Sequence, residues 1–370
     1  MMRYIKSILT LVILLLLNGC IVQFIPEINE NQSFLVVEGM VTNLNQRYTV
    51  KLSRSETVGS RQIPLPVNNS IVSVTDDENN RYLLTEEEPG IYQTDSLTFR
   101  GVIGRKYTLH IQSLGLNYES TPMEMKPVPQ IDSVYYEKMS KQSEDPINHE
   151  SLITYGCQIY LNTFDPTNSC KYYRWEYVET WKFVVPWTVR NQTCWRSSNS
   201  SNIYIKNTSV LGEDRVTKYP LQFVSDETDR LAERYSLLVN QYSVNDEEFI
   251  YWEKLQKVSE SVGSLYDVTP MSIESNIECI EDPNEKVLGY FSVSAVSSKR
   301  IYIDGFRGNV IDFYAECPIY TGSADTSTVW PLAMSGRIAT VWTTQRWCAD
   351  CTARGTKIKP DFWIEQYEEH

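Results

Sequence analysis

The chain has 370 residues and a formal net charge of −13, and 42% of its residues are hydrophobic and 12% aromatic. This apolar content is sufficient for packed cores and excludes a disordered chain. No run of lysine or arginine occurs after residue 19. Binding to a phosphate backbone requires such a basic patch, so the composition excludes nucleic acid as a partner.

The chain begins with the pattern of a secretory signal peptide. Two basic residues precede an apolar run over residues 8–17, which at about ten residues is too short for a bilayer core that needs roughly 20. Leu17-Asn-Gly-Cys20 follows and resembles a bacterial lipobox. We therefore expect residues 1–19 to be a signal peptide and Cys20 to be acylated. An uncleaved anchor and an ordinary signal peptide with a chance cysteine are the alternatives.

The expected acylation of Cys20 makes membrane lipid the first partner, since two or three acyl chains give lasting attachment. The residue after it is Ile21 rather than Asp, so the rule that retains lipoproteins in the inner membrane does not apply. We expect the outer membrane, with the protein on either the cell-surface or the periplasmic face. Residues 20–32 would then be a lipidated tether, in which Pro26 prevents a helix.

Residues 33–125 contain short segments that alternate apolar and polar residues, separated by turns rich in Asn, Asp, Pro and Gly. This spacing is typical of a small Greek-key sandwich. We predict a β-sandwich domain over residues 33–125, of immunoglobulin-like or transthyretin-like topology. The prolines that follow indicate an extended linker, placed at residues 126–130.

Residues 131–370 are predicted to form a larger, β-rich C-terminal domain with at least one helix, so the fold class is mainly β. The segment 172–183 shows the alternation most clearly. Its residues Tyr173, Trp175 and Tyr177 fall on one face of a strand, with the charged residues between them on the other.

A helix is predicted from Asp246 onward. Ser243-Val-Asn-Asp246 has the capping-box pattern, and acidic residues fill the first turn, where the helix dipole favours them. Phe249, Trp252 and Leu255 form an apolar stripe. Gly263 is the predicted end of the helix.

Eight cysteines are present, and acylation of Cys20 would leave seven, enough for at most three disulfides. Cys348 and Cys351 are the closest pair, and we predict a local structural disulfide between them. A zinc site would need a second pair, and a thioredoxin motif would need a βαβ unit. A polar stretch at 191–202 is predicted to be a loop. The pairing of five cysteines stays open: Cys157, Cys170, Cys194, Cys279 and Cys317.

Catalytic and metal-binding motifs are not evident. The three histidines, His110, His149 and His370, have no triad motif around them. No catalytic residue, metal or cofactor is therefore predicted. Core packing explains most of the tryptophans, but Trp187 and Trp195 are near predicted loops and are candidates for stacking on a ligand.

Several segments together resemble a large family of Bacteroidota lipoproteins that is described only as a domain of unknown function. The segments are Tyr172-Tyr-Arg-Trp-Glu-Tyr-Val-Glu-Thr-Trp181, Tyr235-Ser-Leu-Leu-Val-Asn-Gln-Tyr-Ser243, Gly263-Ser-Leu-Tyr-Asp267, Val287-Leu-Gly-Tyr-Phe-Ser-Val-Ser294 and the stretch from Cys348 to Trp363. The resemblance implies an outer-membrane lipoprotein that is often associated with TonB-dependent transporter barrels and has no established enzymatic activity. It also implies that Cys348 and Cys351 belong to the family pattern, whereas Cys157 and Cys170 are particular to this chain.

The expected function is therefore that of a non-enzymatic interaction protein, anchored to the outer membrane and accessory to a TonB-dependent transporter. A surface module that binds glycans or peptides through exposed Trp and Tyr is the first alternative. A cell-envelope hydrolase is the second alternative.

Overall fold

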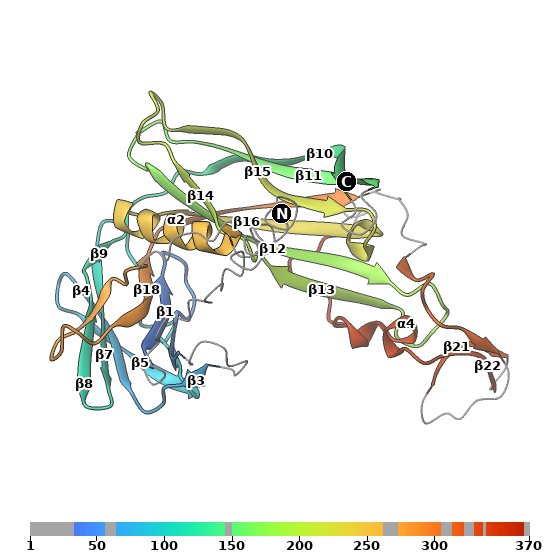
Figure 1. Ribbon diagram of the computed structural model, residues 1–370, viewed down its shortest axis with the longest axis horizontal. Helices are drawn as coiled ribbons and strands as arrows, with labels where there is room; N and C mark the ends of the chain where they lie inside the picture. The colour runs from blue at the N-terminus through green and yellow to red at the C-terminus, as the bar shows by residue number, and fades with distance from the viewer. Residues whose placement is uncertain are drawn as a thin grey trace, which may run out of the picture.

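The computed structural model describes residues 33–55, 64–144, 150–261, 273–304, 313–321, 329–335 and 338–365. The predicted signal peptide, Cys20 and the predicted tether lie outside this range. The predicted mainly β fold class is confirmed: several sheets form two lobes, with one long helix between them (Figure 1). No helix within the described ranges is long and apolar enough to span a membrane.

The N-terminal lobe is a pair of sheets joined through strand β5, which pairs with both β4 and β6. Its strands from the first part of the chain are β1 (Leu35–Val41), β2 (Thr49–Arg54), β3 (Leu65–Pro66), β4 (Ile71–Asp76), β5 (Arg81–Glu88), β6 (Ile91–Gln93), β7 (Lys106–Ser113), β8 (Leu116–Ser120) and β9 (Met123–Glu124). Alternate side chains point into the core, as the two-residue period of a β-strand predicts. Val72, Val74 and Leu109, for example, are fully buried.

Two further strands of this lobe come from far along the chain. β17 (Ile277–Cys279) pairs with β8, and β18 (Val287–Val293) pairs in parallel with β1. Both strands also contribute side chains to the core of the N-terminal lobe. The predicted domain boundary therefore needs correction, since residues 277–293 belong to the N-terminal lobe. The physical reason is that β1 and β8 would otherwise leave their edge N–H and C=O groups unpaired.

Two residues hold this returning segment in place. The side-chain amide of Asn276 donates to the carbonyl oxygen of Phe291 and accepts from its N–H, both at 2.9 Å, and so links the start of β17 to β18. Gly289 has a φ of +89°, and a Cβ there would lie 2.0 Å from the carbonyl oxygen of Val37. Only glycine allows β18 to approach β1 in this way.

We expect Gly289→Ala to destabilise the protein by about 3 kcal/mol or more, because it combines backbone strain with a clash against β1. Gly115→Ala is the matched control, since Gly115 also has a positive φ, of +83°, but nothing lies within 4 Å of a Cβ there. The control variant should lose only the stability that backbone strain removes, about 1–2 kcal/mol. Urea unfolding measures the free energy of unfolding of both variants. Equal losses in the two would show that the close approach to β1 is unimportant.

The C-terminal lobe is a sandwich of a three-stranded and a five-stranded sheet. The first holds β10 (Ile131–Glu144), β11 (Ser151–Phe164) and β15 (Arg215–Ser225), and the second holds β12 (Tyr172–Val184), β13 (Thr193–Asn199), β14 (Tyr204–Asn207), β16 (Arg234–Ser243) and β19 (Val296–Asp304). Tyr173, Trp175 and Tyr177 lie in the core, as predicted. The prediction of a loop at 191–202 was wrong for residues 193–199, because these residues form β13 and pair with β12.

The linker is fixed to this lobe by a buried glutamine. The amide nitrogen of Gln241 donates to the carbonyl oxygen of Pro129 at 2.9 Å and to the hydroxyl of Thr163 at 3.1 Å. Its amide oxygen accepts from the indole nitrogen of Trp175 at 2.9 Å. The amide oxygen and nitrogen both have partners, so the linker is part of the packed structure.

Helix α2 (Asp246–Ser261) lies between the lobes. Its N-cap is Asn245, whose side-chain oxygen accepts from the N–H of Glu248 at 2.8 Å. The predicted capping box was therefore displaced by two residues, because Ser243 is the buried last residue of β16. The predicted helix end at Gly263 lies outside the described residues. Tyr251 packs against the N-terminal core, and the next residue, Trp252, packs against the C-terminal lobe.

The contact between the lobes contains a buried carboxyl group. One oxygen of Glu248 accepts from the hydroxyl of Ser292 on β18 at 2.7 Å and from the indole of Trp252 at 3.1 Å. The guanidinium of Arg174 on β12 lies over the rings of Trp252 and Tyr242, at 4.3 and 4.8 Å. Burial raises the pKa of Glu248, and the charge of Arg174 and the hydrogen bonds offset only part of this effect.

This raised pKa gives the stability of the protein a pH dependence. Folded Glu248 holds its proton more tightly than the unfolded chain does, so its stabilising contribution is complete below its usual pKa of 4.5 and is lost as the pH rises through the native value. We expect Glu248→Gln to be more stable than the wild type at neutral pH and to flatten this decline.

The matched control for this change is Glu253→Gln on the same helix. The side chain of Glu253 is 45% exposed and pairs with Lys257 at 3.0 Å, so its replacement should change stability by less than about 0.5 kcal/mol. Urea unfolding between pH 4 and 8 provides the comparison. An unchanged pH profile in Glu248→Gln would contradict the prediction.

Candidate functional site

A cavity of about 810 Å³ lies at the end of the C-terminal lobe, beside helix α4 (Arg346–Ala349). We call it the α4 cavity. Its walls come from the loop after β15, from the turn at 313–317, and from α4 with the following 3₁₀ turn, η2 (Cys351–Ala353). Beyond α4 lies a small sheet of β20 (Tyr320–Thr321), β21 (Trp330–Ser335) and β22 (Ile338–Thr343) (Figure 1). The lining residues are Glu227, Phe313, Glu316, Arg346, Trp347, Ala353 and Arg354.

Two disulfides join the walls of the α4 cavity. Cys317 is bonded to Cys348, with the Cα atoms 6.0 Å apart, and Cys194 on β13 is bonded to Cys351, with the Cα atoms 5.6 Å apart. Glu316 and Trp347, which line the cavity, are each adjacent to one of these cysteines. The irregular segments of the wall are thus covalently tied to one another and to the sheet.

The predicted disulfide between Cys348 and Cys351 was wrong, although both residues are disulfide-bonded. Cys348 belongs to α4 and Cys351 starts η2, and the extended backbone of Asp350 between them (φ −145°, ψ 106°) separates the two turns. Each cysteine therefore meets a different partner.

The remaining cysteines of the described residues, Cys157, Cys170 and Cys279, are buried free thiols. Burial raises the pKa of Cys157 to about 12 and that of Cys170 to about 11. Thiols with such pKa values are unreactive at neutral pH.

Arg354 is held on the inner wall of the α4 cavity by aromatic rings and a buried acid. Its guanidinium pairs with Asp229 and donates to the hydroxyl of Tyr314 at 3.1 Å. Its Cζ lies 4.7 Å from the ring centroid of Phe313 and 5.5 Å from that of Trp347. Its Nε has no hydrogen-bond partner among the described residues. Burial raises the pKa of Tyr314 to about 12, so this hydroxyl stays neutral.

The outer rim of the α4 cavity carries both donors and acceptors. Arg346 is 54% exposed and pairs with Asp350 at 3.2 Å. Glu227 and Glu316 are exposed carboxylates. Phe313 and Trp347, whose ring centroids are 5.8 Å apart, form the aromatic wall of the cavity.

The tryptophans proposed for stacking, Trp187 and Trp195, do not line the α4 cavity. Trp187 is partly buried against the main core, and Trp195 on β13 meets Trp363 edge to face at 6.4 Å. The indole nitrogens of both are buried. Trp347, which does line the cavity, was not predicted, although its position next to Cys348 pointed to it.

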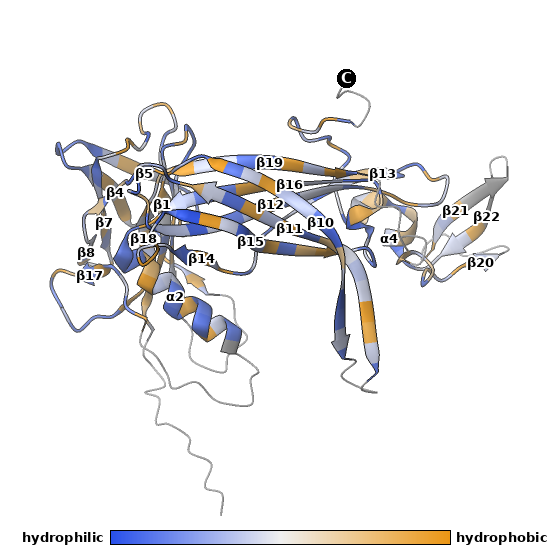
Figure 2. Ribbon diagram, turned by 90° about the horizontal axis from the view of Figure 1, so that it is seen from above, coloured by the Kyte–Doolittle hydropathy of each residue, from blue (hydrophilic) through white to orange (hydrophobic). Residues whose placement is uncertain are grey.

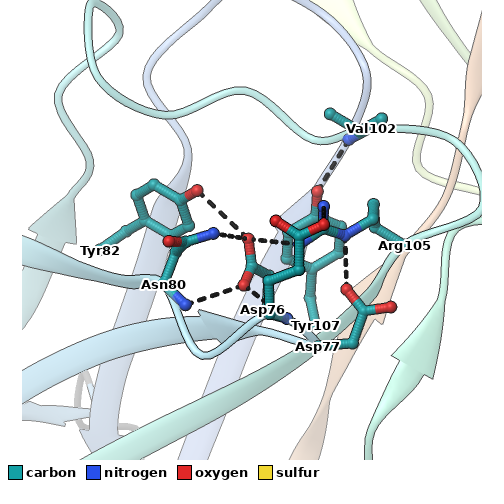
Figure 3. Close-up of polar contacts among 8 residues, drawn as sticks. Asp76, Asp77, Asn80, Tyr82, Val102, Arg105 and Tyr107 are labelled. Carbon is teal, nitrogen blue, oxygen red and sulfur yellow. Dashed lines mark hydrogen bonds and ion pairs between the residues drawn. The ribbon is translucent and has the colours of Figure 1, made fainter.

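A second polar group lies in the N-terminal lobe, at the turn after β4 (Figure 3). Arg105 pairs with Asp76 at 2.9 Å, with Asp77 at 2.5 Å and with Glu78 at 2.6 Å. Burial acts to raise the pKa of Asp76, but hydrogen bonds from Asn80 and Glu78 and the charge of Arg105 hold it below its usual value. The arginine occupies the position that a bound cation would take, so this group stabilises the turn.

The histidines and acidic residues in the part of the chain that the structure describes form no further candidate site. His110 contacts Thr75 at 2.7 Å and Glu119 at 3.3 Å, whereas His149 and His370 lie outside the described residues. No group of three or more His, Cys, Asp or Glu side chains in the described ranges is arranged to hold a metal ion.

Comparison with known protein families gives one match. Residues 22–300 match the family described as a domain of unknown function, DUF4249. The chain belongs to this family. No curated protein matches the chain. The DUF4249 match spans most of both lobes and ends before the turn at 313–317, so Cys348, Cys351 and most of the α4 cavity lie beyond the matched range.

Tryptic mapping without reduction tests the disulfides. Trypsin leaves Cys348 and Cys351 in one peptide, residues 347–354, because no Lys or Arg separates them. The structure predicts that this peptide is recovered joined to both 191–196 and 308–337, and that reduction releases all three. A free 347–354 peptide with an internal disulfide would contradict the observed pairing.

Proposed function

We propose that this DUF4249 protein is a non-enzymatic interaction protein, tethered to the outer membrane through acylated Cys20 and accessory to a TonB-dependent transporter barrel. The N-terminal sequence supports the tether. The structural observation that supports an interaction role is a projecting part of the β10–β11 hairpin.

We call this part the ribbon tip and define it as residues 137–144 and 151–155. It leaves the body of the C-terminal lobe as a two-stranded ribbon (Figure 2). A two-stranded ribbon is only marginally stable in water, yet this one exposes four large apolar side chains. They are Met139 at 38%, Leu152 at 50%, Ile153 at 52% and Tyr155 at 57%. Groups of exposed apolar residues mark interaction sites.

The register of the ribbon tip favours a protein partner. Ile153 is opposite Gln142 and Tyr155 is opposite Ser140, which places both apolar residues on one face. Leu152 and Met139, by the same pairing, lie on the other face. A lipid surface can cover only one face of a ribbon, whereas a cleft in a protein can enclose both.

We expect the double variant Ile153→Ser, Tyr155→Ser to reduce co-purification of the barrel from solubilised outer membranes at least tenfold, or about 1.4 kcal/mol of binding free energy. The ribbon tip is exposed, so the variant should unfold at the same temperature as the wild type. Leu97→Ser is the matched control, because Leu97 is 92% exposed in the N-terminal lobe.

Purification of the wild type without any barrel would contradict the accessory role. A mature N-terminus without acyl chains on Cys20, found by mass spectrometry, would contradict the anchor.

A further inference from the structure

We propose that the α4 cavity binds a neutral saccharide. A sugar ring would stack on the aromatic wall of Phe313 and Trp347, and its hydroxyls would be shared by Arg346, Glu227 and Glu316. This site is separate from the ribbon tip and does not depend on the proposed transporter partner.

The α4 cavity has the size and rigidity of a ligand site. Its volume of about 810 Å³ is within the range of roughly 300–1,000 Å³ that is usual for small-molecule pockets. Its irregular wall segments are held by the disulfides Cys317–Cys348 and Cys194–Cys351. A site fixed in this way loses little conformational entropy on binding.

The charges around the α4 cavity disfavour an anionic ligand. Both arginines are already paired, Arg346 with Asp350 and Arg354 with Asp229. Glu227 and Glu316 then leave an excess of negative charge at the rim. A carboxylate, sulfate or phosphate would therefore enter against net repulsion.

A cationic ligand is disfavoured for a different reason. The guanidinium of Arg354 already makes the cation–π contacts of this wall, since its Cζ lies 4.7 Å from the ring centroid of Phe313 and 5.5 Å from that of Trp347. A cationic ligand would therefore gain little cation–π attraction here. An uncharged ligand uses the wall through its C–H groups instead and needs no free cation–π site.

A sugar matches the groups that remain. Its hydroxyls donate to the carboxylates of Glu227 and Glu316, and they accept from the exposed guanidinium of Arg346. Its C–H face is apolar and fits the aromatic wall. A purely apolar ligand would leave these polar groups without partners, which costs binding free energy.

The test is titration calorimetry of the whole mature protein with neutral oligosaccharides of glucose, galactose, mannose and xylose, with their uronic-acid counterparts, and with a lysine-rich peptide. We expect at least one neutral oligosaccharide to bind, and to bind at least tenfold more tightly than its uronic-acid counterpart and than the peptide. No binding by any neutral oligosaccharide at millimolar concentration overturns the proposal, as does tighter binding of the charged probes.

Variants locate the binding site. Glu227→Ala combined with Glu316→Ala should weaken saccharide binding at least tenfold, and both residues are exposed, so folding should be retained. Glu213→Ala is the matched control, since this glutamate is 70% exposed on the same lobe but does not line the cavity. Trp347→Phe should also weaken binding. Unchanged affinity in the double glutamate variant would overturn the assignment to the α4 cavity.

The two proposals of function can fail separately. The ribbon-tip variant Ile153→Ser, Tyr155→Ser should keep full saccharide affinity, because its substitutions lie outside the α4 cavity. Loss of saccharide binding in that variant would contradict the separation of the two sites.

Discussion

The pairing of two strand edges is the constraint on which the arrangement of this protein depends. Strands β1 and β8 end the sheet that residues 33–125 form, and each requires a hydrogen-bonding partner. The chain supplies both partners by leaving the C-terminal lobe for β17 and β18 and returning to it at β19. The polypeptide therefore crosses between the lobes three times, and a single flexible linker does not describe the connection.

Helix α2 is positioned by these crossings. The neighbouring residues Tyr251 and Trp252 face different lobes, and Glu248 joins the helix to β18 from within the contact. Because both sides of the helix are packed, the lobes are held in one relative orientation. The ribbon tip and the α4 cavity both belong to the C-terminal lobe, so the distance between these two sites is fixed.

Local patterns in the sequence predicted local structure well. The alternation around Trp175 and the apolar stripe on α2 gave the correct element types, because each depends on neighbours within a few residues. The domain boundary failed, because the parallel pairing of β1 with β18 joins segments that no short-range pattern connects. The spacing of Cys348 and Cys351 indicated a local disulfide, but the backbone at Asp350 directs them apart. The α4 cavity was not foreseen, since its walls are joined by the disulfides of Cys194 and Cys317, whose partners the sequence left open.

The late position of β18 has a consequence for the order in which the protein forms. The N-terminal lobe is synthesised first, yet it is incomplete until the ribosome has passed residue 293. From residue 125 until residue 293 the emerging chain holds strands whose outer edges lack their partners, and such edges are prone to wrong pairing with other chains. The lobe that emerges first is thus completed only after most of the chain has followed it.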